Sequence, residues 1–380
     1  MEMDGSLIER DYLIFEEAIK TSKLMRDYPP RFFHNFKKIL YDIAACGASL
    51  NNGLGNKPGQ RESAIKVFDD PEITITRWRA MQLPLMFPPK NSATEYLMRK
   101  DVFNYNNEFG KKPGHFEWYL NFADTDLFMG YGGSLMAQDE LQVAEHPALA
   151  SIREMLLNKS EKDPDFEPCT RDINGNPTPY LIRGVERRLS IAINANAKEG
   201  RPDGLYGNKF ASVSEDTIRK ACKPIIPPTI THLIAMEAPS RGKNEYTLDQ
   251  ITDIFTTAYT AFMAAKHVGS HFLHADSMRI LDTPSRIPES VVTIHTGNWG
   301  TGAYGGNKII MALLQLAAAR AAYVDRLVYH TFSNEYSIAY KEALDLLSQK
   351  LIPGKKRITT PSFLKQVQDL RFKWGVSDGN

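Results

Sequence analysis

A glycine-rich segment at residues 295–308, HTGNWGTGAYGGNK, places five glycines between two apolar segments and constrains the fold more than any other stretch. The residues before it, SVVTI (290–294), are rich in β-branched side chains and predict a strand, and IIMALLQLAAARAAYV (309–324) after it predicts a helix. LVYHTF (327–332) predicts a second strand. In such a strand–loop–helix–strand unit, a glycine-rich loop that opens a helix is suited to bind a phosphate.

Strands and helices also alternate through the middle of the chain. The expected strands are WYLNFA (118–123), RRLSIAINA (187–195) and THLIAMEA (231–238), and the expected helices include LMAQDELQVAEHPALASIREMLL (135–157) and YTLDQITDIFTTAYTAFMAAKHVG (246–269). In the second of these helices Thr247 and Gln250 fit a capping box, and Gly269 can end the helix. This alternation predicts an α/β domain with a largely buried sheet.

Residues before about position 110 show a different pattern. FEEAIKTSKLM (15–25) and FHNFKKILYDIAA (33–45) have apolar residues at helical spacing, whereas NNGLGNKPGQRES (51–63) has the composition of a polar loop. We therefore expect a helical accessory region over residues 1–110. At the other end of the chain, we expect residues 351–380 to form a surface tail.

Composition limits the classes of function. The 380 residues carry a formal net charge of +1, which gives no support for non-specific nucleic-acid binding, and 42% are hydrophobic, which suffices for a proper core. No window reaches ~18 uninterrupted apolar residues, and the acidic N-terminus does not resemble a signal peptide. Cys46, Cys169 and Cys222 are too scattered for a disulfide framework or a zinc site. We expect an intracellular monomer, cytoplasmic or nuclear, that binds no nucleic acid, membrane or metal.

Two common phosphate-binding motifs can be compared with the glycine-rich segment. Gly300, Gly302 and Gly305 satisfy G-x-G-x-x-G, but a dinucleotide-binding fold needs an acid after the next strand, and Asp325 precedes that strand. A P-loop is excluded because the residue directly before Lys308 is Asn307 rather than glycine, and the residue after it is Ile309 rather than serine or threonine. A Rossmann oxidoreductase therefore stays open only as a third hypothesis, and an ordinary tight turn is the plainest alternative.

Several motifs, taken together and in order, resemble those of the poly(ADP-ribose) glycohydrolase family. They are TGNWGTGAYGG with the helix and strand after it, YLNFADTDLFMGYGGSLMAQDE, EHPALASIREMLL and LIAMEA, all between about residues 115 and 335. The resemblance implies a macrodomain, a mixed sheet between helices, over residues 111–350, with the helical accessory region before it. It also implies an enzyme that hydrolyses ADP-ribosyl bonds without a metal or a cofactor.

By this resemblance, two glycine loops hold the diphosphate of ADP-ribose, because glycine lets the backbone approach a ligand closely. The first loop contributes Gly130, Gly132 and Gly133, and the second contributes Gly300, Gly302, Ala303, Gly305 and Gly306, ahead of a helix dipole. Around them, Phe332 and Tyr206 match aromatic residues at the adenine, Tyr304 matches one at the reacting ribose, and Asn298 matches a residue near the ligand. For the two adenine-side aromatics, core packing is the alternative.

The resemblance assigns the chemistry to QDE at residues 138–140. Glu140 stands where the family has the acid that protonates the departing oxygen and then deprotonates water. Asp139 stands where an acid binds ribose hydroxyls, and Gln138 completes the substrate-binding motif. A carboxyl group suits acid–base work if burial raises its pKa toward the working pH. Without the resemblance, this segment would be interpreted as a solvated helix surface.

Two departures from the family pattern bear on the substrate. The first glycine loop is shorter and is interrupted by Tyr131, and Asp124 replaces a neutral amide beside the reacting ribose. Asp124, Asp126, Asp139 and Glu140 could gather in one pocket, where crowded carboxylates need a cation or a proton. A guanidinium would serve, which leads to the hypothesis that the substrate includes ADP-ribosyl-arginine. The alternative is that Asp124 lies at a solvated edge.

The leading hypothesis is thus a hydrolase that releases ADP-ribose from poly(ADP-ribose) or from ADP-ribosylated protein. The competing hypothesis is a catalytically weak macrodomain that binds ADP-ribose as a reader without cleaving it. An acid at position 140 favours the hydrolase, whereas the altered glycine loop keeps the reader open.

Overall fold

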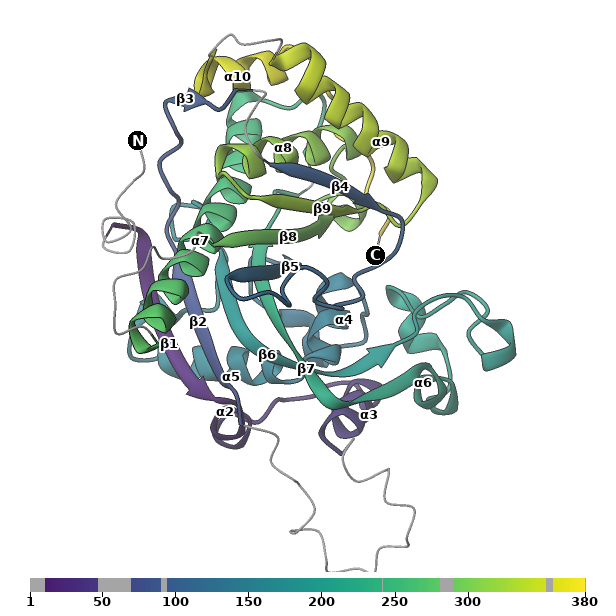
Figure 1. Cartoon of the computed structure of the whole chain (residues 1–380). Coiled ribbons are helices and arrows are strands. Elements are labelled where there is room, and N and C mark those ends of the chain that lie inside the picture. Colours follow the sequence, from purple (N-terminus) through teal and green to yellow (C-terminus); the bar gives the residue numbers. More distant parts are fainter. Residues whose placement is uncertain are drawn as a thin grey trace, which may run out of the picture.

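An eight-stranded mixed sheet forms the centre of the protein (Figure 1). Its strands are β1 (Leu13–Lys20), β2 (Glu72–Trp78), β4 (Glu95–Arg99), β5 (His115–Ala123), β6 (Tyr180–Ile191), β7 (Cys222–Glu237), β8 (Val291–Gly297) and β9 (Arg326–His330). They lie in the order β1-β2-β6-β7-β5-β8-β9-β4. Neighbours are antiparallel from β1 to β7 and parallel from β7 to β4.

The computed structural model describes residues 11–46, 70–89, 94–240, 242–280, 290–352 and 358–379. Its helices are α2 (Thr21–Asp27), α3 (Asn35–Cys46), α4 (Gln138–Glu145), α5 (Ala148–Ser160), α6 (Glu215–Ala221), α7 (Leu248–Ile280), α8 (Lys308–Ala321), α9 (Asn334–Asp345) and α10 (Thr360–Gln368). A separate pair of short strands joins β3 (Met86–Phe87) to β10 (Ile358–Thr359). The predicted capping box of α7 is confirmed, because Thr247 and Gln250 exchange hydrogen bonds at 3.1 and 3.2 Å.

The sheet separates two helical layers because alternate side chains of a strand point to opposite faces. On β5, Trp118 and Leu120 pack into one core with residues of α7 and α8. Tyr119 and Ala123, which alternate with them, pack into a second core with residues of α5. The predicted α/β architecture, a mixed sheet between helices, is therefore confirmed.

A third, smaller core supports the start of α4. β6 and β7 extend beyond the rest of the sheet, and α6 lies in the segment that joins them (Figure 1). Leu40 of α3, Met136, Phe210 and Ile218 of α6 pack together there. Through this cluster the N-terminal region contacts the helix that carries the predicted catalytic acids.

We expected the first 110 residues to be helical, but the structure shows both strands and helices there. They supply three strands of the central sheet, β1 and β2 at one edge and β4 at the other. The predicted helix over residues 15–25 is wrong in its first half, because β1 pairs with β2 residue by residue and α2 begins only at Thr21. Such tertiary pairing overrides local helical spacing. The predicted loop at 51–63 lies outside the described residues, and the division at 110 and 350 stays a prediction.

Two expectations for the second half of the chain are also wrong. Gly269 does not end α7, which continues to Ile280; a side chain there would approach Val292 of β8 to 3.1 Å, so glycine permits close helix–strand packing. The C-terminal segment is not merely a surface tail, because Phe363 of α10 is fully buried and stacks on Phe87 at 4.1 Å between ring centroids.

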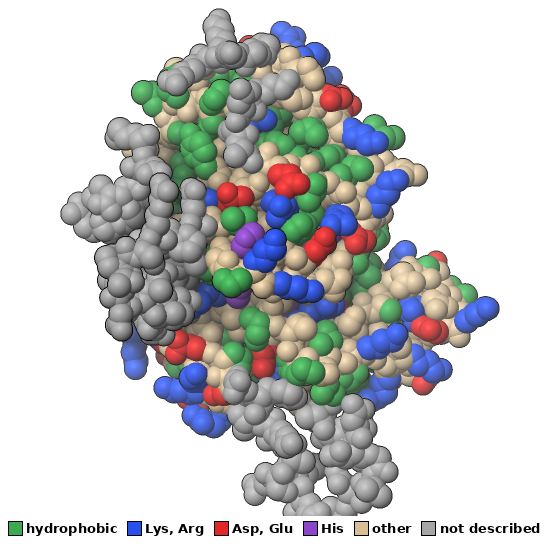
Figure 2. Space-filling model, in the orientation of Figure 1, with side chains coloured by type: hydrophobic (Ala, Val, Ile, Leu, Met, Phe, Trp, Pro, Cys, Tyr) green, Lys and Arg blue, Asp and Glu red, His purple; other side chains and the backbone are tan. Residues whose placement is uncertain are grey.

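The surface carries charges of both signs. Figure 2 shows Lys and Arg side chains interspersed with Asp and Glu side chains over one face of the molecule. Among the described residues, no helix has the length and apolarity needed to cross a membrane.

Candidate functional site

The two predicted catalytic acids lie in the first turn of α4 and are buried. Asp139 and Glu140 follow Gln138, the first residue of this helix. Only 8% of Asp139 and 6% of Glu140 is exposed. The alternative of a solvated helix surface is therefore wrong for this segment.

Asn121 on β5 holds Asp139 in place. Its Nδ2 donates to Asp139 Oδ1 at 2.9 Å, and Asn121 is itself fully buried. Burial, followed by the charge of Glu140, raises the pKa of Asp139 to about 8, although the bond from Asn121 and the charge of Lys37 oppose this shift. Asp139 therefore holds a proton near neutral pH, so the acid pair has one to supply.

The side chain of Glu140 lies against the first glycine loop. Its Oε2 accepts a hydrogen bond from the N–H of Ala137 at 3.0 Å. A Cβ atom on Gly130 would lie only 2.2 Å from Glu140 Oε1. Glycine at position 130 thus leaves the space that the carboxyl group of Glu140 occupies.

Gln138 fixes α4 to the end of the strand. Its Oε1 accepts from the N–H of Phe122 at 2.8 Å, and its Nε2 donates to the carbonyl oxygen of Leu120 at 3.0 Å. Both ends of the amide are thus bonded to the backbone of β5. This arrangement gives Gln138 a role in placing the acid pair, and its predicted contact with substrate stays a prediction.

The other glycines of the first loop lie in different surroundings. A Cβ atom on Gly132 would meet the carbonyl oxygen of Arg31 at 2.5 Å, whereas one on Gly133 would lie 3.5 Å from the nearest backbone oxygen. The carbonyl oxygen of Gly132 also accepts from the N–H groups of Phe33 and His34. Position 132 therefore requires a glycine because the N-terminal segment packs against it, a reason that the sequence did not suggest.

The second glycine loop, between β8 and α8, is closely packed on itself. Gly300 has a φ of +73°, and a Cβ atom there would lie 2.5 Å from Met311. Asn307 caps α8, because its Oδ1 accepts from the N–H groups of Ile309 and Ile310. Two N–H groups of the first turn of α8 are therefore bonded to Asn307, and the predicted binding of a phosphate at this loop ahead of the helix dipole stays a prediction.

The C-terminal segment lies on the second glycine loop. Ser377 Oγ donates to the carbonyl oxygen of Ala303 at 2.7 Å, and the N–H of Asp378 donates to that of Gly302 at 3.3 Å. A Cβ atom on Gly305 would lie 3.2 Å from the nitrogen of Ser377. Gly302 and Gly305 are thus constrained by this segment as well as by their own backbone.

A hydrogen bond joins the two glycine-rich regions. Tyr304 Oη donates to Asp124 Oδ2 at 2.8 Å, and burial together with the charge of Asp124 raises the pKa of this tyrosine. Asp126, by contrast, pairs with the Arg153 guanidinium at 2.5 and 3.0 Å. Of the four acids expected in one pocket, Asp126 is thus already matched with an arginine of the protein.

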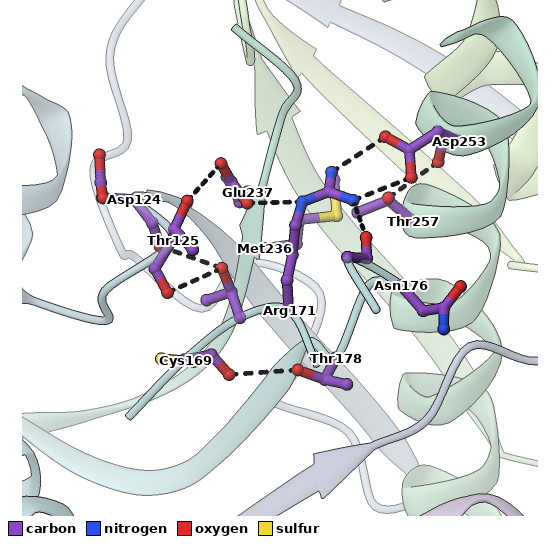
Figure 3. Close-up of polar contacts among 12 residues, drawn as sticks. Asp124, Thr125, Cys169, Arg171, Asn176, Thr178, Met236, Glu237, Asp253 and Thr257 are labelled. Atoms are coloured by element: carbon purple, nitrogen blue, oxygen red, sulfur yellow. Dashed lines mark hydrogen bonds and ion pairs between the residues drawn. The ribbon is translucent and has the colours of Figure 1, made fainter. Parts of the chain in front are cut away.

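A second arginine neutralises the acid at the end of β7 (Figure 3). Arg171 Nε donates to Glu237 at 2.6 Å, and its terminal nitrogens donate to Asp253 of α7 at 2.9 and 3.0 Å. Glu237 also accepts from Thr125 Oγ1 at 2.7 Å. Arg171 therefore supports, through Glu237 and Thr125, the backbone beside Asp124.

The predicted ligand-side residues differ in exposure. Phe332 is 64% exposed, so the alternative that it packs in the core is wrong. Its φ of +61° is a left-handed conformation that is uncommon for a non-glycine residue. Tyr206 is 41% exposed and lies near Glu140; burial, then the charge of Glu140, raises its pKa to about 12. Asn298 Nδ2 donates to the carbonyl oxygen of Thr331, and its buried Oδ1 has no partner among the described residues. Their contacts with a ligand stay predictions.

Sequence analysis missed two residues of this site. They are Asn121 on β5 and Lys37 of α3. Lys37 stands on the apolar face of its helix, one turn before Leu40, and this position was the signal available in the sequence. Only 2% of Lys37 is exposed.

Within the described part of the chain, no three His, Cys, Asp or Glu side chains are grouped so that they could hold a metal ion. His295 is buried and bonded to Glu117 at 2.7 Å and to His330 at 2.9 Å.

Residues 204–338 match the family model described as poly(ADP-ribose) glycohydrolase (PARG), macro domain fold. The matched residues include Tyr206, the second glycine loop and Phe332. The acid pair and the first glycine loop lie before the matched residues. The family resemblance stated from the motifs is confirmed by this match.

Among solved structures, the chain is similar to Deinococcus radiodurans poly(ADP-ribose) glycohydrolase in complex with ADP-ribose, with 10% identity, a TM-score of 0.39 and coverage of 92% of this chain and 99% of that one. It is also similar to a Trypanosoma brucei macrodomain in complex with ADP, with 11% identity, a TM-score of 0.33 and coverage of 88% and 98%. TM-scores this low support no further conclusion.

The raised pKa of Asp139 predicts how stability depends on pH. The folded state keeps this proton up to about pH 8, whereas the unfolded chain releases it near 3.8, so wild-type stability falls as pH rises between these values. Asp139→Asn removes the effect. We expect its melting temperature to match that of the wild type near pH 4 and to exceed it increasingly toward pH 8, as the two unfolding free energies diverge by on the order of 1 kcal/mol per pH unit.

Thermal unfolding of both proteins at several pH values measures this difference. Asp42→Asn, on the exposed and ion-paired side of α3, is the matched control and should follow the wild type. Parallel curves for wild type and Asp139→Asn would show that Asp139 has no raised pKa.

Proposed function

Residues 204–338 carry the macro domain sequence of the poly(ADP-ribose) glycohydrolase family, and on that premise we propose that the protein is an ADP-ribosyl hydrolase. It would release ADP-ribose from poly(ADP-ribose) or from ADP-ribosylated protein by hydrolysis at the anomeric carbon of the ribose. One observation carries the proposal: two carboxyl groups are buried at the start of α4, beside a glycine loop, where burial raises the pKa of Asp139.

On poly(ADP-ribose), the proposed reaction breaks the bond between the anomeric carbon and the leaving oxygen; on an arginine-linked substrate, it would break the bond from that carbon to a guanidinium nitrogen. The proton that the acid pair holds passes through Glu140 to the leaving atom as the bond breaks, and Glu140 then removes a proton from the water that attacks the anomeric carbon. The carboxyl group is thus restored, and the products are ADP-ribose and the freed hydroxyl or guanidinium group. Asp139 orients the ribose through its hydroxyls, and Asn121 sets the direction of Asp139.

The remaining ligand contacts follow the arrangement of the two loops. The backbones of the first and second glycine loops would hold the diphosphate, and the hydrogen bond between Tyr304 and Asp124 keeps both loops at the reacting ribose. Phe332, exposed after β9, would pack on the adenine. Tyr206, 41% exposed, would be a second aromatic on the adenine side.

Release of ADP-ribose tests the proposal directly. Poly(ADP-ribose) and a protein ADP-ribosylated on arginine are incubated with the enzyme side by side, and free ADP-ribose is measured by mass spectrometry. We expect release by the wild type, and Glu140→Gln should lose at least about 100-fold in rate because it can neither donate nor accept the proton. ADP-ribose affinity should change little in this variant.

The competing reader hypothesis makes a different forecast in the same experiment. A reader would bind ADP-ribose, for example by calorimetry, and would release none from either substrate, with or without Glu140. That result would overturn the hydrolase and favour the reader. Binding of a nicotinamide dinucleotide without ADP-ribose release would favour the third hypothesis, an oxidoreductase.

Arginine-linked ADP-ribose is the second candidate substrate, and one observation favours it. The carboxylate of Asp124 lies at the reacting end of the site, where it raises the pKa of Asp139 and bonds Tyr304. A substrate guanidinium could pair with it. The site has less need of a substrate cation than the sequence suggested. Asp126 is already paired with Arg153, and Lys37 already supplies a positive charge near the acid pair.

Asp124→Asn separates the two substrates. The amide can still accept from Tyr304 but cannot pair with a guanidinium, so we expect turnover of the arginine-linked substrate to fall about tenfold or more, with poly(ADP-ribose) turnover largely kept. Initial rates on both substrates measure the ratio. An unchanged rate on the arginine-linked substrate would remove Asp124 as a specificity residue.

Gly130→Ala should disable the acid without unfolding the protein. The added methyl group would collide with Glu140 Oε1, the mobile end of a side chain, so the carboxyl group moves while the fold is kept. We expect a loss of about 100-fold in turnover with a small change in melting temperature. Combining Gly130→Ala with Glu140→Gln should add little to either single loss; additive losses would show that Gly130 acts elsewhere.

A further inference from the structure

Lys37 is a buried cation that contacts no anion directly. Its Nζ has no hydrogen-bond partner among the described residues, although only 2% of the residue is exposed. The ammonium lies 5.4 Å from the centre of the Phe210 ring, beside a small cavity. A buried ammonium without a bonded partner is costly unless nearby negative charges compensate it.

The cavity around Lys37 is formed by the elements that place the acid pair. Its lining side chains come from the segment before α3, from α3, from the first glycine loop, from the last turn of α4 and from the start of α5: Phe32, Lys37, Tyr41, Tyr131, Val143, Ala144, Pro147 and Ala150. Lys37 thus reaches from the N-terminal region toward the site. The same region is tied to the first glycine loop by the bond from the N–H of Arg31 to Tyr131.

The charged groups that face Lys37 are few. Burial lowers its pKa to about 8, and the charges of Glu140 and then Asp139, both on α4, act in the opposite direction. On α3 the neighbouring titratable group is Tyr41, and on the glycine loop it is Tyr131. Tyr131 is bonded to Glu154 of α5 at 2.8 Å, so that carboxylate is engaged elsewhere.

We propose that Lys37 is a positioning residue for catalysis, which acts through Asp139 and Glu140 by balancing the negative charge that the pair carries in its active form. When the two carboxyl groups keep one proton between them, one negative charge is left in a buried site. The ammonium of Lys37 compensates this charge at a distance. The pair can therefore exchange a proton at a lower pH than burial alone would allow.

This proposal deepens the proposed hydrolase and rests on it. It also explains why α3 packs against the start of α4. The N-terminal region would supply a charge that the macrodomain part of the chain does not provide, so docking of α3 becomes a condition for activity rather than only a source of stability.

The main experiment compares the pH dependence of kcat/KM for ADP-ribose release by the wild type, Lys37→Met and Lys37→Arg. Methionine fills the same space without the charge. Without the cation the pair holds its protons to higher pH, so we expect the profile of Lys37→Met to move up by about one pH unit, with about tenfold lower turnover on the acid side. Lys37→Arg should restore the wild-type profile.

Lys38→Met is the matched control on the next residue of the same helix. Lys38 is exposed and pairs with Asp42, so the profile of this variant should not move. Melting temperatures show whether each variant folds. The proposal is overturned if folded Lys37→Met has the same pH profile as the wild type. It is also overturned if the profile of Lys37→Arg moves as far as that of Lys37→Met, because arginine keeps the charge.

A spectroscopic measurement separates this inference from the proposed function. The carboxyl carbon of Asp139 is followed by NMR during a pH titration of aspartate-labelled protein, with Asp139→Asn to identify its signal. We expect a higher titration midpoint in Lys37→Met than in the wild type. If the wild type releases no ADP-ribose, the hydrolase fails, and the midpoint alone decides Lys37: an unmoved midpoint refutes its role.

Discussion

The burial of two adjacent carboxyl groups, Asp139 and Glu140, is the constraint on which the rest of the site depends. Desolvation and mutual repulsion both favour protonation, and Asp139 has its pKa raised to about 8 as a result. The surrounding residues limit this effect rather than remove it: Asn121 donates a hydrogen bond to one acid, and Lys37 offers a charge from another helix. The pair therefore has a proton available near neutral pH, which is the condition for acid–base catalysis at a glycosidic bond.

The geometry of the acid pair depends on backbone contacts as much as on charge. Gln138 is bonded at both ends of its amide to β5, which sets where α4 begins. Gly130 leaves room for the carboxyl group of Glu140, and the bond between Tyr304 and Asp124 links this region to the second glycine loop. Residues far apart in the chain thus meet at the carboxyl ends of parallel strands, where α/β sheets commonly bind ligands.

Local patterns predicted the parts of the fold whose local and tertiary preferences agree. The long apolar stripe of α7, its capping residues and the strands β5, β8 and β9 all follow from spacing alone. β1 did not, because FEEAIK has helical spacing, and only pairing with β2 makes it a strand. Gly269 likewise suggested a helix end, whereas the approach of β8 explains it better. Both errors came from contacts with residues distant in the sequence.

By itself, the sequence determined the class of fold and the two glycine loops, because each of these is a local pattern of residue types, and it singled out Asp139 and Glu140 only through the family resemblance. Tertiary structure alone decided that the acid pair is buried, that Arg153 and Arg171 neutralise Asp126 and Glu237, and that Lys37 faces the pair. The physical reason is the range of the forces involved. Strand and helix preferences act over a few residues, whereas desolvation and charge pairing depend on which distant segments the fold brings together.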